Sequence, residues 1–512
     1  MKKFLLALVI ITLTFSLAAC GETNGENGEN DNGLDNGNDN GNDTDNGENG
    51  DNGAEDTMPP LPDYDVDLSS LDLEGQEINF YTHVVNEDNP FDDGYVHPDG
   101  DEYREHLTML QDTYNFELVF RSWSDYENRV NDVANHVLGS NDSAIIRAPE
   151  LDFMLDLISA GYLSNFTHVA DALQDEYAVN QWQVDAGSVN DNVFAIQNKD
   201  GEVYVDLMVY NLDLLEEAGV EKTPSEMWVD GEWTTSAMES YLRTLSLELD
   251  NSIYPLAITP YHIGLYGPAA NGTKFVDDEG QLQLLNIETL DVLYEYKNWY
   301  DYGYIMPLNF DNDVLRHHVA DNWQRQEAVF GMAMMWQLSG YAESVSFDFG
   351  AVPFPQNDDA SKEDYYSPLG SGDLQMVTIG SNADEVATIL FLINEFHKDA
   401  VNSELESFCD GRDDVSLNEC ASIMNVQEYL RLTDDGEIER AEKIFTFLQG
   451  NSEENAIATN DLAYLNGETQ YISAVQEYMQ AGGSPRNYID ATIPIIQNNI
   501  DRMLEAIRSS RE

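Results

Sequence analysis

Basic residues are scarce in this chain. Its 512 residues include 23 lysines and arginines against 96 aspartates and glutamates, for a formal net charge of −73 at pH 7. So acidic a surface repels phosphate groups, which argues against nucleic acid and anionic lipid as partners. The acids suit either recognition of cationic solutes or hydration in a saline or alkaline exterior. We favour the second explanation, because the acids are spread along the whole chain.

Cysteine is also rare, with three residues at Cys20, Cys409 and Cys420. Three cysteines fit an exported protein, and the last two are separated by a short polar loop. A disulfide between them would stabilise the fold by about 3 kcal/mol in the chain-entropy model. Two free thiols or a metal site are the alternatives. We favour the disulfide, because no histidine or third cysteine lies nearby.

Catalytic motifs are missing. The chain has no His-Glu-x-x-His, no Gly-x-Ser-x-Gly, no phosphate loop and no dinucleotide glycine pattern. Its nine histidines are scattered, and we expect no metal or cofactor. Residues 92–101 form an acid-rich loop that has the oxygen ligands for Ca²⁺ but not the EF-hand spacing, so we expect a solvated loop. Paired carboxylates are frequent in any chain this acidic, and they give little support to a glycosidase. We therefore expect a protein that is not an enzyme.

Long apolar runs are absent except at the amino terminus. Lys2 and Lys3 precede an apolar run over residues 4–15, which is short for a membrane span. The sequence Leu-Ala-Ala-Cys then ends at Cys20 and resembles a lipobox, in which the peptide is cut before the cysteine and the thiol carries diacylglycerol. We predict a lipoprotein signal peptide over residues 1–19 and a lipid anchor on Cys20, at the extracellular face of the cell membrane. An ordinary signal peptide or an anchor helix is the alternative.

Residues 21–57 consist almost entirely of Gly, Asn, Asp and Glu, with no basic residue. Such a segment cannot bury a core and repels itself. We predict a disordered acidic tether over residues 20–60 that lifts the folded region off the membrane surface.

The most informative stretch alternates strand, helix, loop and helix. An apolar run over residues 205–209 predicts a buried strand, and Asn211 is placed to cap a short helix. Gly219 can end that helix in the left-handed conformation. After a proline-containing loop a second helix is predicted to start near residues 234–236, where Ser236 and Glu239 fit a capping box. This order is typical of an α/β protein.

The same stretch resembles the signature of family 1 extracellular solute-binding proteins, the receptors of ABC importers, to which maltose-binding protein is related. The matching elements are Tyr-Asn at 210–211, Leu-Leu-Glu-Glu-Ala-Gly at 214–219, and Gly-Glu-Trp-Thr at 231–234. The chain departs from the family at residues 235–237, where members often have an aromatic residue and two acids. In the order of its motifs the resemblance extends over about residues 75–508.

The resemblance implies an α/β, two-lobed, periplasmic-binding-protein-like (type II) fold with two hinge crossings and a ligand cleft between the lobes. The first lobe is expected to comprise residues 75–205 plus 350–400, and the second lobe residues 206–349 plus 401–512. The hinge crossings are expected at residues 201–209 and 349–355.

Nine residues are candidates for ligand binding, because the resemblance places them after strands, at hinge crossings or in loops facing the cleft. They are Arg147, Glu150, Asp152, Tyr204, Asp206, Tyr261, Trp336, Tyr341 and Asp373. Carboxylates and guanidinium groups form directional hydrogen bonds with sugar hydroxyls, and aromatic rings stack on sugar faces. Two other interpretations stay open: Asp152 as a helix cap and Trp336 as a core residue.

The resemblance implies a receptor that captures a carbohydrate, which we expect to be an oligosaccharide, by hinge closure and delivers it to an ABC permease. The first alternative is the same fold binding a cationic or peptide-like solute. The second alternative is a surface enzyme acting on polysaccharide. We expect the receptor to be a monomer.

Overall fold

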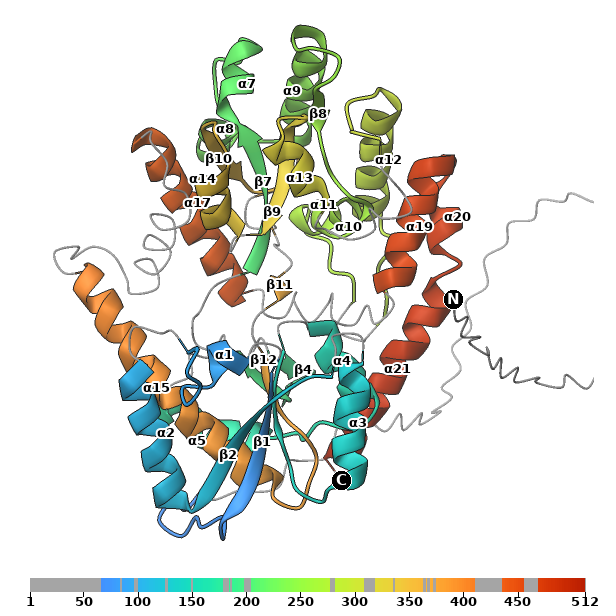
Figure 1. Cartoon of the computed structure of the whole chain (residues 1–512). Coiled ribbons are helices and arrows are strands. Elements are labelled where there is room, and N and C mark those ends of the chain that lie inside the picture. Colours follow the sequence, from blue (N-terminus) through green and yellow to red (C-terminus); the bar gives the residue numbers. More distant parts are fainter. Residues whose placement is uncertain are drawn as a thin grey trace, which may run out of the picture. The chain divides into compact units, whose positions relative to one another are not determined.

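The computed structural model describes residues 66–511 with gaps at 83–84, 96–99, 125–127, 149–150, 178–183, 185–186, 198–203, 277–280, 308–317, 335–336, 362–364, 366–368, 372–373, 410–434 and 455–467. Within this part of the chain, no helix combines the length and the apolar character needed to cross a bilayer. Two larger β-sheets, each with its own helices and hydrophobic core, define a first and a second lobe (Figure 1).

The sheet of the first lobe has five strands in the order β2-β1-β3-β12-β6. β1 runs parallel to β2 and β3, whereas β12 is antiparallel to β3 and β6. The strands are β1 (Gln76–Thr82), β2 (Phe116–Ser122), β3 (Ile145–Ala148), β6 (Ala195–Gln197) and β12 (Leu374–Val377), beside a hairpin of β4 (Ser188–Val189) and β5 (Asn192–Val193). The helices are α1 (Val85–Asp88), α2 (Gly100–Tyr114), α3 (Arg129–Gly139), α4 (Leu151–Ser159), α5 (Thr167–Tyr177) and α15 (Ala383–Cys409).

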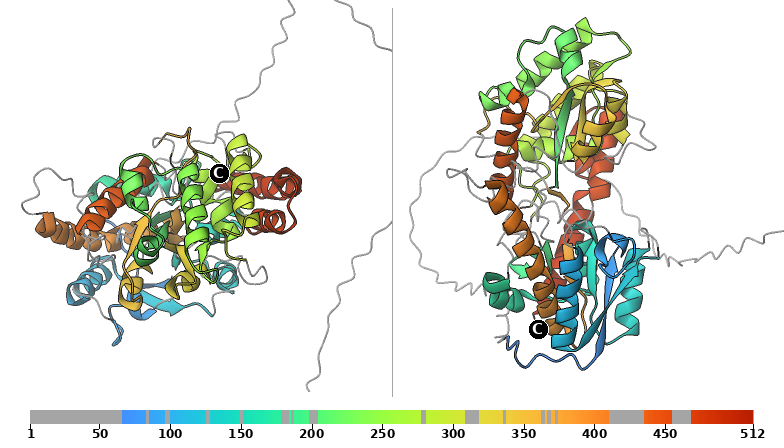
Figure 2. Two further views of the ribbon diagram at one scale, coloured as in Figure 1. Left: turned by 90° about the horizontal axis from the view of Figure 1, so that it is seen from above. Right: turned by 60° about the vertical axis from the view of Figure 1, so that its left-hand side comes forward.

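Helices cover both faces of this sheet, because its central strands are apolar on both sides. Ile78 and Phe80 of β1 pack in a core with residues of α2, α5 and α15. α2 and α15 lie side by side in Figure 1 and in the right-hand view of Figure 2. On the other face, Ile146 of β3 packs with Phe153 of α4.

The sheet of the second lobe has the order β10-β7-β9-β8, and β11 pairs with the start of β7. β7 is antiparallel to β9 and β10, and β8 is parallel to β9. The strands are β7 (Tyr204–Asn211), β8 (Tyr254–Leu256), β9 (Ala328–Met334), β10 (Phe349–Val352) and β11 (Leu369–Ser371). The helices are α7 (Leu212–Glu217), α8 (Pro224–Val229), α9 (Thr235–Glu248), α10 (Pro260–Gly264), α11 (Tyr266–Ala270), α12 (Ile287–Asp301), α13 (His318–Gln324), α14 (Gln337–Ser344), α17 (Asp435–Glu454), α19 (Glu468–Ala481) and α20 (Pro485–Ile489).

The tryptophan of the signature stretch is a core residue of the second lobe. The ring of Trp233 is stacked against that of Phe330 with 6.3 Å between centroids. Its Nε1 donates a hydrogen bond to the carbonyl of Pro353 at 2.9 Å. Trp233 therefore joins β9 to the segment that follows β10.

The chain passes between the lobes at more than one place. It leaves the first sheet after β6, enters the second at β7, and is back in the first sheet at β12. β10 lies in the second sheet and Phe354 in the second core, so the return comes after Ser371 and not at the predicted residue 350. The difference arises because β10 is held by backbone pairing with β7, which the side-chain pattern does not show.

The last helix, α21 (Ile493–Ser510), contributes to both cores. Ile496 and Ile500 belong to the core of the second lobe, whereas Met503 and Ile507 pack with α4 and β12 of the first. The prediction placed all of residues 401–512 in the second lobe. The end of α21 differs because its apolar stripe continues past that lobe.

Helix capping in the signature stretch follows the sequence in part. Asn211 caps α7 by accepting a hydrogen bond from the Leu214 N–H at 3.0 Å, as predicted. Gly219 has φ +73°, the left-handed conformation predicted for it.

The predicted capping box is wrong. The N-cap of α9 is Thr234, not Ser236. The capping box of this region lies at the start of α8, where Thr223 and Glu226 exchange hydrogen bonds. The segment was expected to be a loop because of Pro224, but proline is well accommodated in the first turn of a helix.

Candidate functional site

Arg147 is a predicted site residue of the first lobe whose side chain the structure describes. It lies on β3 at the carboxyl edge of the parallel strands and forms an ion pair with Asp88 of α1. Thr82, the last residue of β1, donates a hydrogen bond to the same carboxylate. The Asp88 side chain is only 3% exposed, so the charge of Arg147 is compensated by a buried partner. No sequence pattern points to Asp88, because its pairing with Arg147 depends on how β1 and β3 align.

Asp206 is the centre of a second group of residues, in the second lobe. It lies near the start of β7, is 1% exposed, and its Oδ2 is 3.4 Å from Nε2 of His262. The other ring nitrogen, Nδ1, is 2.8 Å from the hydroxyl of Thr259. Thr259 is the N-cap of α10, and its hydroxyl accepts from the His262 N–H. The short helix α10 thus places an imidazole against the strand on which the chain enters this lobe.

Two predicted tyrosines belong to the same region. Tyr261 is 9% exposed, and its ring meets that of His262 edge-on, with 5.4 Å between centroids. Tyr341 of α14 is 7% exposed. Burial raises the pKa of Tyr341 well above its ordinary value, and the carboxylates of Asp321 and Asp206 raise it further, so its hydroxyl remains a hydrogen-bond donor at neutral pH. Asp206 and Tyr261 thus adjoin His262, and Tyr341 is close enough for the Asp206 carboxylate to influence it. We call these four residues the second-lobe cluster.

The second-lobe cluster is not arranged as a hydrolase triad. Asp206, His262 and Thr259 resemble an acid, base and hydroxyl nucleophile, but the Thr259 side chain is fully buried and serves as a helix cap. A nucleophile has to reach the reacting atom of a substrate. Buried polar groups beside aromatic faces suit the binding of a polar solute.

The remaining predicted site residues are described only in part or not at all. Asp152 is the second residue of α4, and Tyr204 is the first residue of β7, where it pairs with Ser371 of β11. Glu150, Trp336 and Asp373 lie outside the described residues.

The predicted modification sites also fall largely outside the described residues. Cys20 and Cys420 lie outside them, and Cys409 is described only as the last residue of α15. Among the residues that are described, no group of three or more His, Cys, Asp or Glu side chains is placed to hold a metal ion.

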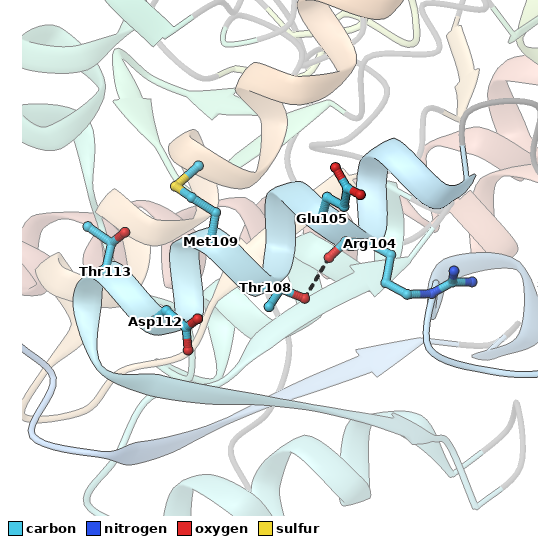
Figure 3. Close-up of a pocket in the computed structure, with 6 residues that line it drawn as sticks. All are labelled: Arg104, Glu105, Thr108, Met109, Asp112 and Thr113. Carbon is cyan, nitrogen blue, oxygen red and sulfur yellow. Dashed lines mark hydrogen bonds between the residues drawn. The ribbon is translucent and has the colours of Figure 1, made fainter.

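A surface hollow along α2 involves none of the predicted site residues (Figure 3). All of its lining side chains come from this one helix: Arg104, Glu105, Thr108, Met109, Asp112 and Thr113. The Thr108 hydroxyl donates to the carbonyl of Arg104 at 2.8 Å. A one-helix hollow lacks the converging polar groups of a ligand site.

Two α/β lobes, joined where the chain passes from β6 to β7 and from β11 to β12, define the fold of the periplasmic solute-binding proteins. Comparison with solved structures shows the same fold. Over 84% of this chain and 99% of the other, the fold is similar to the ABC substrate-binding protein Lmo0181 of Listeria monocytogenes in complex with cycloalternan, with a TM-score of 0.50 and 12% identity.

Two further solved structures have comparable similarity. Maltose-bound MalE3 of T. maritima has a TM-score of 0.50 and 14% identity, over 83% of this chain and 99% of that chain. UgpB of Mycobacterium tuberculosis, in complex with glycerophosphocholine, has a TM-score of 0.51 and 15% identity over the same shares. No family model matches the chain, and no curated protein sequence matches it.

Proposed function

We propose that the protein is the extracellular, lipid-anchored receptor of an ABC importer, and that it captures a carbohydrate, specifically an oligosaccharide, for delivery to a membrane permease. The observation that carries this proposal is the gathering of Asp206, Tyr261, His262 and Tyr341 in the second lobe of a solute-binding fold. Similar structures hold cycloalternan and maltose. In this proposal the protein acts as a monomer and binds without catalysing a reaction.

The proposed site combines residues of both lobes. Direct contacts with the solute are assigned to eight residues: Arg147, Glu150, Asp152, Tyr204, Tyr261, Trp336, Tyr341 and Asp373. Asp206 is too deeply buried for broad contact with a solute, and we assign it a supporting role next to His262. Closure of the lobes is then driven by the tighter binding of solute to the closed state.

A neutral ligand fits the described charges better than a cation does. Asp88 is already paired with Arg147, and Asp206 already faces His262. A cationic ligand would have to compete with Arg147 for Asp88, whereas sugar hydroxyls need only polar groups. A similar fold nevertheless holds glycerophosphocholine, a zwitterion with a quaternary ammonium group, in UgpB. A cationic or peptide-like solute is therefore kept as the second candidate.

Calorimetric titration against maltose, maltotriose, cycloalternan and acarbose, with a lysine-rich tripeptide as the cationic probe, tests the proposal. We expect heat of binding with an oligosaccharide and a smaller radius of gyration in X-ray scattering when it is bound. Heat with the tripeptide alone would favour the second candidate. No heat and no compaction with any sugar would contradict the carbohydrate proposal.

Tyr261→Ala tests the second-lobe cluster directly. Loss of a packed aromatic face should weaken sugar binding by about tenfold or more, equivalent to about 1.4 kcal/mol. Tyr302→Ala, which removes a 63% exposed tyrosine next to α12, is the matched control and should leave affinity unchanged. Equal affinities of the two variants would remove Tyr261 from the site.

The lipid anchor is tested separately in cells. Wild type should incorporate labelled fatty acid, and Cys20→Ala should abolish that incorporation. Wild type that stays in the membrane without label would indicate an uncleaved anchor helix. Either result leaves the sugar-binding measurement independent, because that is made on the folded region.

A further inference from the structure

His262 contacts the strand by which the chain enters the second lobe and the segment that follows β10. Its Nε2 is 3.4 Å from the carboxylate of Asp206, on the strand by which the chain enters the second lobe. Its ring stacks on Phe354 with 6.4 Å between centroids and 17° between planes. Phe354 follows β10, on the segment leading back toward the first lobe. Both His262 and Phe354 are at most 1% exposed.

The imidazole has a hydrogen-bond partner at Nδ1, and its Nε2 faces the Asp206 carboxylate. Nδ1 is 2.8 Å from the Thr259 hydroxyl, which also accepts from the His262 N–H. A hydroxyl has one proton to donate and two lone pairs. With the proton on Nε2, the ring donates toward Asp206 and accepts from Thr259, so both nitrogens are used.

This ring in turn borders Tyr261. The two rings are nearly perpendicular, at 86°, and Tyr266 lies 6.0 Å from Tyr261 and 5.7 Å from His262 between centroids. Aromatic rings in these geometries restrict one another's movement. A change in the position of Asp206 or Phe354 therefore reaches the ring of Tyr261 through a single side chain.

We propose that His262 is a positioning residue of the ligand site, which couples the arrangement of Asp206 and Phe354 to that of Tyr261. The proposal depends on the function proposed above. It predicts that the imidazole nitrogens contribute to affinity although the ring is too buried to serve as a main contact of the solute. The resemblance in sequence points to Tyr261 as a ligand contact and, less securely, to His262, but it implies no positioning role for His262.

The test compares His262→Phe with His262→Gln. Phenylalanine keeps a ring among Tyr261, Tyr266 and Phe354 but lacks both nitrogens, whereas the glutamine amide can still donate toward Asp206. The probe is the sugar among maltose, maltotriose, cycloalternan and acarbose that binds wild type most tightly. We expect His262→Phe to bind about tenfold more weakly or worse and His262→Gln to recover part of the loss. Thermal unfolding of each variant establishes that it is folded at the titration temperature.

His168→Phe is the matched control. His168 of α5 also faces a carboxylate, with Nε2 3.0 Å from Asp384 Oδ1, and its side chain is 10% exposed. It lies in the first lobe, away from the second-lobe cluster, so its replacement should leave affinity unchanged. A similar loss in both variants would overturn the proposal, because the effect would then be general.

Three further outcomes would overturn the positioning role. His262→Phe binding as tightly as wild type would show that the nitrogens do not matter. Failure of both His262 variants to fold would assign the residue to stability alone. If wild type bound no sugar, the proposed function would fail, and the positioning proposal would fall with it. Loss of binding in the variant alone leaves the proposed function intact, so the two failures are distinguishable.

Discussion

At the level of single residues, Glu437 shows how a buried carboxylate can hold an element in place. It is 3% exposed and accepts hydrogen bonds from Tyr210 at 3.1 Å, Ser225 at 2.8 Å and Arg440 at 2.8 Å. These partners lie on β7, α8 and α17. A buried charge with several partners costs much more to unpair than an exposed one. Glu437 therefore attaches the late helix α17 to the strand that opens the second lobe.

Arg440→Ala should destabilise the protein by about 3 kcal/mol, because it leaves the Glu437 carboxylate buried without its cation. Urea unfolding monitored by tryptophan fluorescence measures the loss. Lys443→Ala is the control on the same helix, since Lys443 pairs with Glu439 and both side chains are at least half exposed. It should cost less than about 1 kcal/mol. Similar losses in the two variants would show that Glu437 does not need Arg440.

The environment of Glu295 predicts that the stability of the protein depends on pH. Burial, followed by the nearby carboxylates of Glu239, Asp358 and Asp291, raises the pKa of Glu295 from 4.5 to about 7. The folded protein therefore holds this proton more tightly than the unfolded chain does, and the stability that the group contributes is lost as pH rises from 4.5 to about 7. Glu295→Gln should match wild type near pH 4.5 and should be the more stable protein at about pH 8.

Thermal midpoints of both proteins across that range measure the difference. Glu477→Gln on α19, where the side chain is exposed, is the control and should give a flat difference. A Glu295→Gln difference that does not grow with pH would contradict the prediction. The comparison uses the difference in thermal midpoint between variant and wild type, because the net charge of −73 makes the stability of every variant depend on pH.

At the level of elements, the sequence pattern correctly predicted those strands and helix ends that depend on neighbouring residues alone. The apolar run over residues 205–209 became β7, Asn211 caps α7, and Gly219 ends the helix region with positive φ. The sequence pattern misses α8 because it predicts a proline-containing loop there, although Pro224 stands in the first turn of the helix. Pairings between distant residues, such as Arg147 with Asp88 and Asp206 with His262, have no local signature. The sequence therefore predicted Arg147 and Asp206 as candidate site residues but did not predict the residues with which they pair.

Gly350→Ala tests the contact between β10 and β7. A methyl group at this position would clash with the ring and hydroxyl of Tyr210, the residue that donates to Glu437. We expect a loss of about 1–3 kcal/mol, as in other overpacked cores, from urea unfolding. Gly340→Ala in α14 is the matched control, because no atom lies within 4 Å of the added methyl group. It should be neutral or stabilise by up to about 1 kcal/mol. If Gly350→Ala left the free energy of unfolding unchanged, the side chain of Tyr210 would have to move aside at little cost, which would contradict the prediction.

At the level of the whole molecule, α21 is the element that both lobes share. Its first turns are buried with the second lobe and its last turns with the first. Beyond the helix, Arg511 Nε donates to Asn192 Oδ1 of the first lobe at 2.5 Å. Any opening or closing of the lobes therefore has to be accommodated along this helix.

Ile507→Ala should destabilise the first lobe by about 2–4 kcal/mol, because Ile507 is fully buried against it. Hydrogen exchange should show faster exchange in β3 and α4 than in β8 and β9. Ile495→Ala on the same helix removes a side chain that is 50% exposed and should cost less than about 1 kcal/mol. Uniformly faster exchange in both lobes would instead indicate that they unfold as one unit.

The position of α21 also bears on synthesis and export. The first lobe begins with β1, yet its sheet is incomplete until β12 has been made, and its core includes Met503 and Ile507 close to the end of the chain. The first half of the polypeptide thus cannot fold into a complete domain before translation ends. For a chain that is secreted as we propose, this late completion is useful, because a translocation channel threads unfolded chains. The first lobe would then complete its folding only outside the cell, after Met503 and Ile507 have been translocated.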